Sequence, residues 1–205
     1  MHPRLDEVLF RHLHSTWQQP IHEHSRQAFE SIRSRAESAE ALVLDSGCGV
    51  GQSTAQLADR HPNALVLGID KSSHRLARSS RVPDNALLLR ADLTDFWRLA
   101  SAAGWSLEAH YLLYPNPWPK AVHLQRRWHA HPVFPVLLAL GGRLELRTNF
   151  RIYADEFRRA LRLAGVCADE VVSFRPDFPI SPFEAKYDDS GHDLYRLTVQ
   201  LETQK

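Results

Sequence analysis

The sequence predicts an α/β fold in which a mostly parallel sheet carries helices on both faces. From residue 41 onward, short apolar runs alternate with helical segments, as expected for repeated strand–helix units. A glycine-rich turn, Gly47-x-Gly49-x-Gly51, follows the first apolar run and precedes a helical segment. The chain has 205 residues, which is enough for one such domain with a full core.

The strands are predicted from short apolar runs bounded by turn residues. Five runs give the expected parallel strands at residues 41–45, 65–70, 86–90, 109–113 and 143–147. Two more runs near the C-terminus, at residues 171–174 and 194–201, are expected to form an antiparallel pair. The predicted sheet therefore has seven strands, and its last strand is antiparallel.

Helices are expected between the strands, where apolar residues recur at helical spacing. The predicted helices cover residues 52–60, a segment from 72 or 73 to about 80, a segment from about 95, residues 125–140 and residues 153–164. Pro62 ends the first of these helices, a serine caps the second, and Gly165 stops the last. The helix at 125–140 is expected to be interrupted at Pro132 and Pro135.

Residues 1–38 differ in composition from the rest of the chain. They are polar and rich in Arg, Glu, Ser and His, while Leu5, Leu9 and Leu13 recur at helical spacing. Pro20 is expected to break this segment into two helices. The predicted organisation is a helical N-terminal arm at residues 1–38 and one α/β domain at residues 39–205.

Composition excludes several classes of protein. The net charge is +1, so any nucleic acid must be bound by a local basic patch. The longest apolar run, residues 133–140, is too short to span a bilayer, and the N-terminus lacks the apolar core of a signal peptide. Cys48 and Cys167 are typical thiols of a reducing cytoplasm, which is the expected location. The twelve histidines have no zinc-like spacing, so we expect them at the surface and expect no metal.

Polar side chains stand at the ends of all five predicted parallel strands. In chain order they are Asp45, Asp70, Asp92, Asn116 and Asn149. The carboxyl ends of parallel strands meet at one edge of the sheet, where ligands bind in this class of fold. We therefore expect one crevice in which Asp70 accepts hydrogen bonds from a ribose diol and Asp92 accepts from an adenine amino group.

The glycine turn and the acids together resemble the class I methyltransferases, which use S-adenosylmethionine. The turn is G-x-G-x-G at Gly47, Gly49 and Gly51, not the G-x-G-x-x-G of dinucleotide enzymes. The resemblance implies a Rossmann-like fold and an S-adenosylmethionine site. In that site Asp45 orients the methionine end, Asp70 binds the ribose and Asp92 binds the adenine.

A second motif, Tyr114-Pro-Asn-Pro-Trp-Pro-Lys120, follows the fourth predicted strand. With the residues around it, this motif resembles the signature of the bacterial tRNA (guanine-N7)-methyltransferases, which is P-D-P-W-x-K, then H, then K-R-R, with T-D and T-x-(F/Y)-E further on. The resemblance implies that tRNA is the partner, with the protein a monomer or weak homodimer, and that Asn116 has the catalytic position beside the cofactor. The implied substrate-binding residues are Lys120, His123, Arg126, Arg127, Asn149, Ser181, Phe183 and Glu184.

The match departs from the family at several positions. Asn116 and Asn149 replace aspartates, Gln125 replaces a lysine and Ser181 replaces a threonine. A carboxylate accepts two hydrogen bonds from the N1–H and N2–H edge of guanine, whereas an amide accepts at one end and donates at the other. Two alternatives therefore stay open: a methyltransferase for an exocyclic amine or other base, or a non-catalytic protein that binds cofactor or RNA. The indole of Trp118 either belongs to the core or stacks on a ligand.

Overall fold

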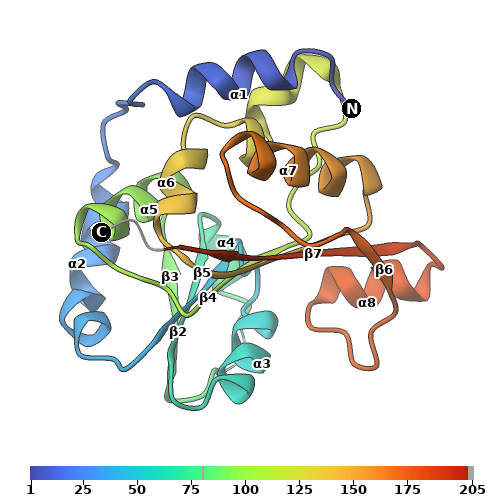
Figure 1. Ribbon diagram of the computed structural model, residues 1–205. Coiled ribbons are helices and arrows are strands. Elements are labelled where there is room, and N and C mark those ends of the chain that lie inside the picture. Colours follow the sequence, from blue (N-terminus) through green and yellow to red (C-terminus); the bar gives the residue numbers. More distant parts are fainter. Residues whose placement is uncertain (80, 203–205) are drawn as a thin grey trace.

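The computed structural model describes residues 1–79 and 81–202 (Figure 1). Its seven-stranded sheet has the order β3-β2-β1-β4-β5-β7-β6. The strands are β1 (Leu42–Ser46), β2 (Leu65–Asp70), β3 (Ala86–Arg90), β4 (Ala109–Leu113), β5 (Gly142–Thr148), β6 (Val172–Phe174) and β7 (Leu194–Leu201). All seven predicted strands are confirmed to within one or two residues at each end.

Strand directions also agree with the prediction. Strands β1 to β5 pair in parallel, whereas β7 pairs antiparallel with both β5 and β6. The strand order reverses between β1 and β4, because β1 leads outward to β2 and β3 on one side while β4 leads to β5 on the other. A crevice opens at such a reversal, outside the carboxyl ends of the strands.

Both faces of the sheet are buried, as the apolar character of its strands requires. Side chains alternate between faces, so Leu42 and Leu44 of β1 join one apolar cluster while Val43 joins the other. Helices α1, α6 and α7 cover one face, and α3 and α8 lie on the opposite side (Figure 1). Mostly apolar strands thus dictate a three-layer α/β architecture.

The helices are α1 (Leu5–Leu13), α2 (Glu23–Glu37), α3 (Gln52–Arg60), α4 (Ser73–Leu76), α5 (Leu93–Ala102), α6 (Phe134–Ala139), α7 (Arg151–Leu163) and α8 (Pro182–Asp189). Two 3₁₀ segments, η1 (Ala121–Arg126) and η2 (Trp128–Ala130), stand where the first part of the 125–140 helix was predicted. The interruption expected at Pro132 is confirmed, since α6 begins only at Phe134. The helix predicted before Pro132 is wrong, because 3₁₀ turns stand there, and the interruption predicted at Pro135 is also wrong, because that residue lies in the first turn of α6. The predicted helix at 72–80 is also too long, since α4 ends at Leu76.

The N-terminal arm forms two helices on either side of Pro20, as predicted. Leu9 of α1 and Phe29 and Ile32 of α2 pack into the same apolar cluster as the sheet. Helix α1 contacts α7 and η2, while α2 contacts α5. The arm therefore covers one face of the sheet and shares its core.

Three histidines of the set expected at the surface are buried, namely His12, His110 and His129, and Nε2 of His110 lies 2.7 Å from the Ser46 hydroxyl oxygen. Nδ1 of His12 lies 3.1 Å from the Ala130 carbonyl oxygen, and His129 lies beside Glu156. Throughout the described ranges, 1–79 and 81–202, no helix combines the length and the apolarity needed to cross a bilayer.

Candidate functional site

A cavity of about 740 Å³ opens at the carboxyl edge of the sheet, at the point where the strand order reverses. Four of the five predicted strand-end residues line it: Asp70, Asp92, Asn116 and Asn149. The loop after β4, helix α8 and the N-terminal arm supply most of the other walls. Its volume lies in the upper range of known ligand sites, which suits a cofactor together with a substrate group.

The glycine turn exposes its backbone to open space. Gly47 and Gly49 have φ angles of 87° and 61°, which favour glycine, and a Cβ added at either residue would meet no atom within 4 Å. A ligand can therefore lie directly against this backbone. At Gly51 the reason for glycine is structural. This residue precedes α3 in the left-handed conformation, and a Cβ there would lie 2.6 Å from the Leu88 side chain.

Asp70 connects the glycine turn to the next strand. Its Oδ2 accepts a hydrogen bond from the Gly49 N–H at 3.0 Å, and its Oδ1 accepts from the Ser72 N–H at 2.8 Å. The guanidinium of Arg75 also lies 3.1 Å from Oδ1. Asp70 is thus an oriented carboxylate at the cavity wall, with Arg75 beside its Oδ1.

Asp92 caps helix α5. Its Oδ1 accepts from the Thr94 N–H at 2.9 Å and from the Thr94 hydroxyl at 2.6 Å, which satisfies one of the free N–H groups of the first turn. The side chain is partly exposed and lines the cavity. The two carboxylates of this region accept hydrogen bonds and the glycine turn leaves its backbone open, a combination that fits an adenosyl group.

Asp45 does not line the cavity, contrary to the prediction that it contacts the cofactor. It is buried, and its Oδ2 accepts hydrogen bonds from the hydroxyls of Ser53 and Thr54 in α3. Burial raises the pKa of Asp45 to about 6, although the two hydroxyls oppose that shift. Asp45 therefore fixes α3 against β1 and shapes the glycine turn from behind.

The loop that follows β4 carries Asn116 and Trp118 at the cavity wall. The side-chain oxygen of Asn116 accepts from the Trp118 N–H at 3.2 Å, which closes a local turn. An aspartate would accept the same bond, so the amide leaves the turn unchanged and differs only in what it offers a ligand. The indole of Trp118 is partly exposed and lines the cavity, so it is not a core residue.

The predicted substrate contacts of the following segment occupy different environments. Lys120 and Arg126 are exposed, and the Arg126 guanidinium lies over the Trp118 ring at 4.8 Å from its centroid. The His123 ring packs edge-on against the same indole at 5.3 Å. Arg126 and Trp118 line the cavity, and the exposed Arg126 and Lys120 can be reached by a polyanion.

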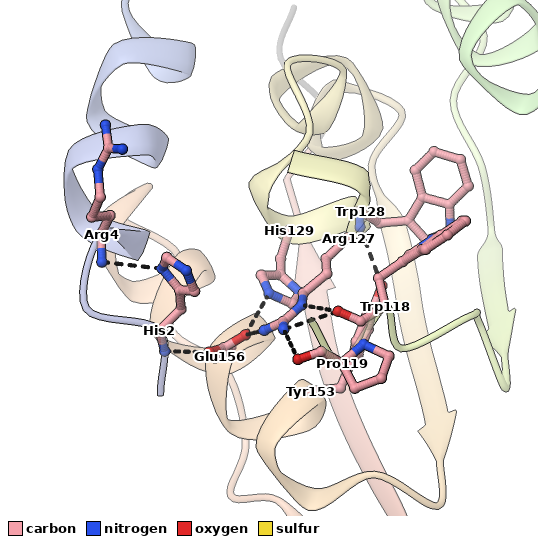
Figure 2. Close-up of polar contacts among 9 residues, drawn as sticks. All are labelled: His2, Arg4, Trp118, Pro119, Arg127, Trp128, His129, Tyr153 and Glu156. Atoms are coloured by element: carbon pink, nitrogen blue, oxygen red, sulfur yellow. Dashed lines mark hydrogen bonds and ion pairs between the residues drawn. The ribbon is translucent and has the colours of Figure 1, made fainter. Parts of the chain in front are cut away.

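Arg127 has a different environment from its exposed neighbour, so the prediction that it contacts phosphate is corrected. Its side chain is buried and pairs with Glu156 of α7. Figure 2 shows the same guanidinium turned toward the backbone of the loop, where it donates to the carbonyl oxygen of Trp118. No face of this guanidinium is left for a phosphate group.

Helix α8, which the sequence analysis missed, brings the C-terminal motif to the cavity. The Ser181 hydroxyl caps it by accepting from the Glu184 N–H at 3.1 Å, and Pro182 occupies its first turn. This Ser-Pro-x-Glu pattern is the signal that could have predicted the helix. Ser181 and Glu184 are both buried, so their predicted direct contact with substrate is also corrected.

The other face of α8 presents aromatic rings to the cavity. Phe183 is 47% exposed, and its ring stacks on that of Tyr187 with centroids 6.3 Å apart. Tyr187 in turn lies beside Tyr114 at 5.6 Å. Together with Asn149, these rings form a wall against which a planar base can stack.

The N-terminal arm closes the end of the cavity near β3. Trp17, Gln19 and His22 line it, although sequence reasoning gave them no role. His22 Nδ1 lies 2.7 Å from Asp95 at the start of α5, and Arg98 lies over the Trp17 ring and donates to the Gln19 carbonyl oxygen. No sequence signal marks these residues, because only the packed fold brings the arm to the sheet edge.

Comparison with known proteins agrees with this geometry. A family model described as "Putative methyltransferase" matches residues 39–197. A tRNA (guanine-N(7)-)-methyltransferase of Leifsonia xyli subsp. xyli is 30% identical over 168 residues, covering 76% of this chain and 74% of that protein. The enzyme of the same name from Nitrosomonas europaea is 28% identical, covering 74% and 72%.

Solved structures share the fold at low sequence identity. An antibiotic-related methyltransferase superposes with a TM-score of 0.62 at 13% identity, covering 91% of this chain and 98% of that one. The 16S rRNA methyltransferase KamB gives 0.61 at 17% identity, covering 90% and 95%. The predicted Rossmann-like class I methyltransferase fold is thereby confirmed. With its strand-edge cavity, its glycine turn and these relatives, the chain belongs to the tRNA (guanine-N7)-methyltransferase family of S-adenosylmethionine-dependent enzymes, as a divergent member.

Proposed function

We propose that this methyltransferase modifies N7 of a guanine in tRNA. The observation that carries the proposal is that the proline-rich loop, helix α8 and the cofactor-type carboxylates all line a single cavity. The curated relatives bear the name of that activity. The alternative acceptor, an exocyclic amine, has no comparable support among these proteins.

On the cofactor side, the turn at Gly47 gives backbone contacts, Asp70 binds the ribose and Asp92 binds the adenine. S-adenosylmethionine supplies an electrophilic methyl group on a sulfonium centre. Nearby carboxylates favour that positive charge, since opposite charges attract across a partly buried site. Arg75 must leave Asp70 before a ribose hydroxyl can take its place.

On the substrate side, N7 of guanine carries a lone pair and no proton, so this reaction needs no general base. The protein has only to orient the base, exclude water and bring the two atoms into line. Phe183 and Tyr187 supply a stacking surface, and Lys120 and Arg126 bind phosphates at the cavity mouth. Asn116 and Asn149 offer hydrogen bonds to the base edge.

The two asparagines change what the base edge meets. The Asn116 oxygen accepts from the Trp118 N–H, and its amide nitrogen adds a donor that an aspartate would not offer to the base. An N–H donor suits O6 of guanine, whereas the family aspartate would suit N1–H and N2–H. We infer that the protein binds the base through O6, not through N1–H and N2–H as in relatives that carry aspartate. N7 remains the atom that accepts the methyl group.

The test is methyl transfer from labelled S-adenosylmethionine to an unmodified tRNA transcript. Reduction followed by aniline cuts the chain at N7-methylguanine, and mass analysis of nucleosides identifies any other product. The expected result is label in N7-methylguanine with the wild-type protein. Label in a different nucleoside would replace the proposed acceptor. Label only after the double change Asn116→Asp and Asn149→Asp would show that the natural chain binds without catalysis.

The proposed setting is a reducing cytoplasm, with the protein acting as a monomer or weak homodimer. Both cysteines are free thiols: Cys48 is buried in the glycine turn and Cys167 is exposed. An exposed thiol of this kind is typical of a reducing compartment. Sedimentation of the purified protein tests the oligomeric state.

A further inference from the structure

The loop after β4 is held in a backbone conformation that ordinary residues avoid. Within residues 1–79 and 81–202, Tyr114 and Trp118 are the two non-glycine residues with positive φ, at 52° and 44°. They bracket the Pro-Asn-Pro segment that carries Asn116. Such strain persists only where the surroundings enforce it, and it is concentrated at functional sites. Something must therefore hold each end of this loop.

A buried arginine–carboxylate pair stands behind each of these two residues. At the first end, the Tyr114 hydroxyl donates to Glu184 Oε1 at 2.9 Å, and Glu184 pairs with Arg147 at 3.0 Å. At the second end, Arg127 donates from Nε and Nη2 to the Trp118 carbonyl oxygen at 3.2 and 3.0 Å. The loop is thus clamped from two sides by groups that do not reach the cavity.

Glu156 fixes the second clamp in place. Its carboxylate pairs with Arg127, accepts from Nε2 of His129 at 3.2 Å and accepts from the backbone N–H of His2 at 2.5 Å (Figure 2). The side chains of Glu156 and His129 are fully buried, and burial lowers the pKa of His129, which keeps the ring neutral. The anchor therefore joins the start of the chain, η2 and α7 to one point of the loop.

We propose that Arg127 is a positioning residue: together with Glu156 it holds the Trp118 carbonyl, and so sets Asn116 and Trp118 against the cavity. The phosphate contact belongs to the exposed neighbour, Arg126. The reason is geometric, because a fork of N–H donors is needed to grip one carbonyl and one carboxylate at once. This inference rests on the proposed function only for its tRNA-binding and catalytic readouts.

The first experiment needs no RNA. Hydrogen exchange of the Trp118 amide, which donates to the Asn116 side chain, is compared between the wild-type protein and Glu156→Gln. At least 10-fold faster exchange is expected, since the variant loosens the clamp. Unchanged exchange would overturn the inference, whether or not the protein methylates tRNA. Failure of the proposed function is thus distinguished from failure of the clamp.

The second experiment separates positioning from phosphate binding. Binding of tRNA is measured over a range of salt for the wild-type protein, for Arg126→Gln and for the double variant Arg127→Met with Glu156→Leu. A lost phosphate contact lowers the slope of log K against log salt by about 0.8. We expect that loss for Arg126→Gln and an unchanged slope for the double variant. Equal loss in both would overturn the inference.

Catalysis gives the third readout. If the double variant does not fold, the single variant Arg127→Lys tests whether Arg127 positions the loop. Lysine keeps a point charge for phosphate but lacks the fork, so kcat is expected to fall at least 10-fold while the Kd for S-adenosylhomocysteine stays within about twofold. Glu156→Gln is expected to lower kcat similarly, although the buried Glu156 side chain cannot contact RNA. Full activity of Arg127→Lys would overturn the inference.

Discussion

The charge on Glu156 has a calculable effect on stability. Burial alone would raise the pKa of this carboxyl, but hydrogen bonds from His129, the His2 N–H and Arg127 lower it from 4.5 to about 2. A lowered carboxyl pKa means that the folded state favours the charged form. The resulting stability is fully present above about pH 4.5 and is lost as the pH falls toward 2. A shift of this size corresponds to about 3 kcal/mol.

The perturbation is Glu156→Gln, because glutamine has the shape of the protonated carboxyl. Urea unfolding of both proteins should give a difference in the free energy of unfolding of about 3 kcal/mol at pH 7, shrinking to about 2 kcal/mol near pH 3.5. Other carboxylates with lowered pKa values, such as Asp6 and Glu145, cancel in this difference. A difference below about 1 kcal/mol at pH 7, or one that does not change with pH, would refute the reasoning.

Three further predictions concern the cavity walls. Trp17→Ala should weaken binding of S-adenosylhomocysteine by roughly 10-fold in calorimetry, because it removes an aromatic wall, whereas Phe10→Ala on the exposed side of α1 should change nothing. Arg75→Ala should tighten the same binding by up to about fivefold, because the half-exposed Arg75 guanidinium no longer competes with the ribose for the buried Asp70 carboxylate, a competition worth about 1 kcal/mol; weaker binding would refute this. Phe183→Ala should raise the KM for tRNA roughly 10-fold through lost stacking and leave cofactor affinity unchanged.

Much of the sheet could be predicted because each strand is a local pattern. The alternation of apolar runs with helices defined all seven strands, and the polar residues just after them pointed to the correct edge. Asp70, Asp92, Asn116 and Asn149 meet at the cavity for that reason. The alternation of strands and helices along the chain implies a parallel sheet, and in a parallel sheet the carboxyl ends of the strands share one edge.

Predictions failed where the role of a side chain depends on partners far away in the chain. Arg126 and Arg127 are adjacent and chemically identical, yet one is exposed and the other is buried against Glu156, 29 residues later. Similarly, Glu184 looked like a substrate contact but pairs with Arg147 behind the loop. Charge alone does not tell a phosphate contact from a buried clamp; only the packing of α7 and α8 does.

Helix boundaries failed for a local reason. In the helix predicted at 125–140, Pro132 has no backbone donor, and short 3₁₀ turns stand before it in place of an α-helix. The arm residues Trp17 and His22 carried no signal, because their role arises from docking onto α5.

The most direct test is a calorimetric titration of S-adenosylhomocysteine into the wild-type protein and Asp70→Asn, since every proposed role assumes that the adenosyl group binds at this edge of the sheet. Saturable binding by the wild-type protein is predicted, with affinity at least 10-fold weaker in the variant, because a hydrogen bond to a charged group is worth about 1.5–3 kcal/mol. Absence of binding heat in the wild-type protein, confirmed by equilibrium dialysis, or equal affinity in the two proteins, would contradict the assignment of the cavity.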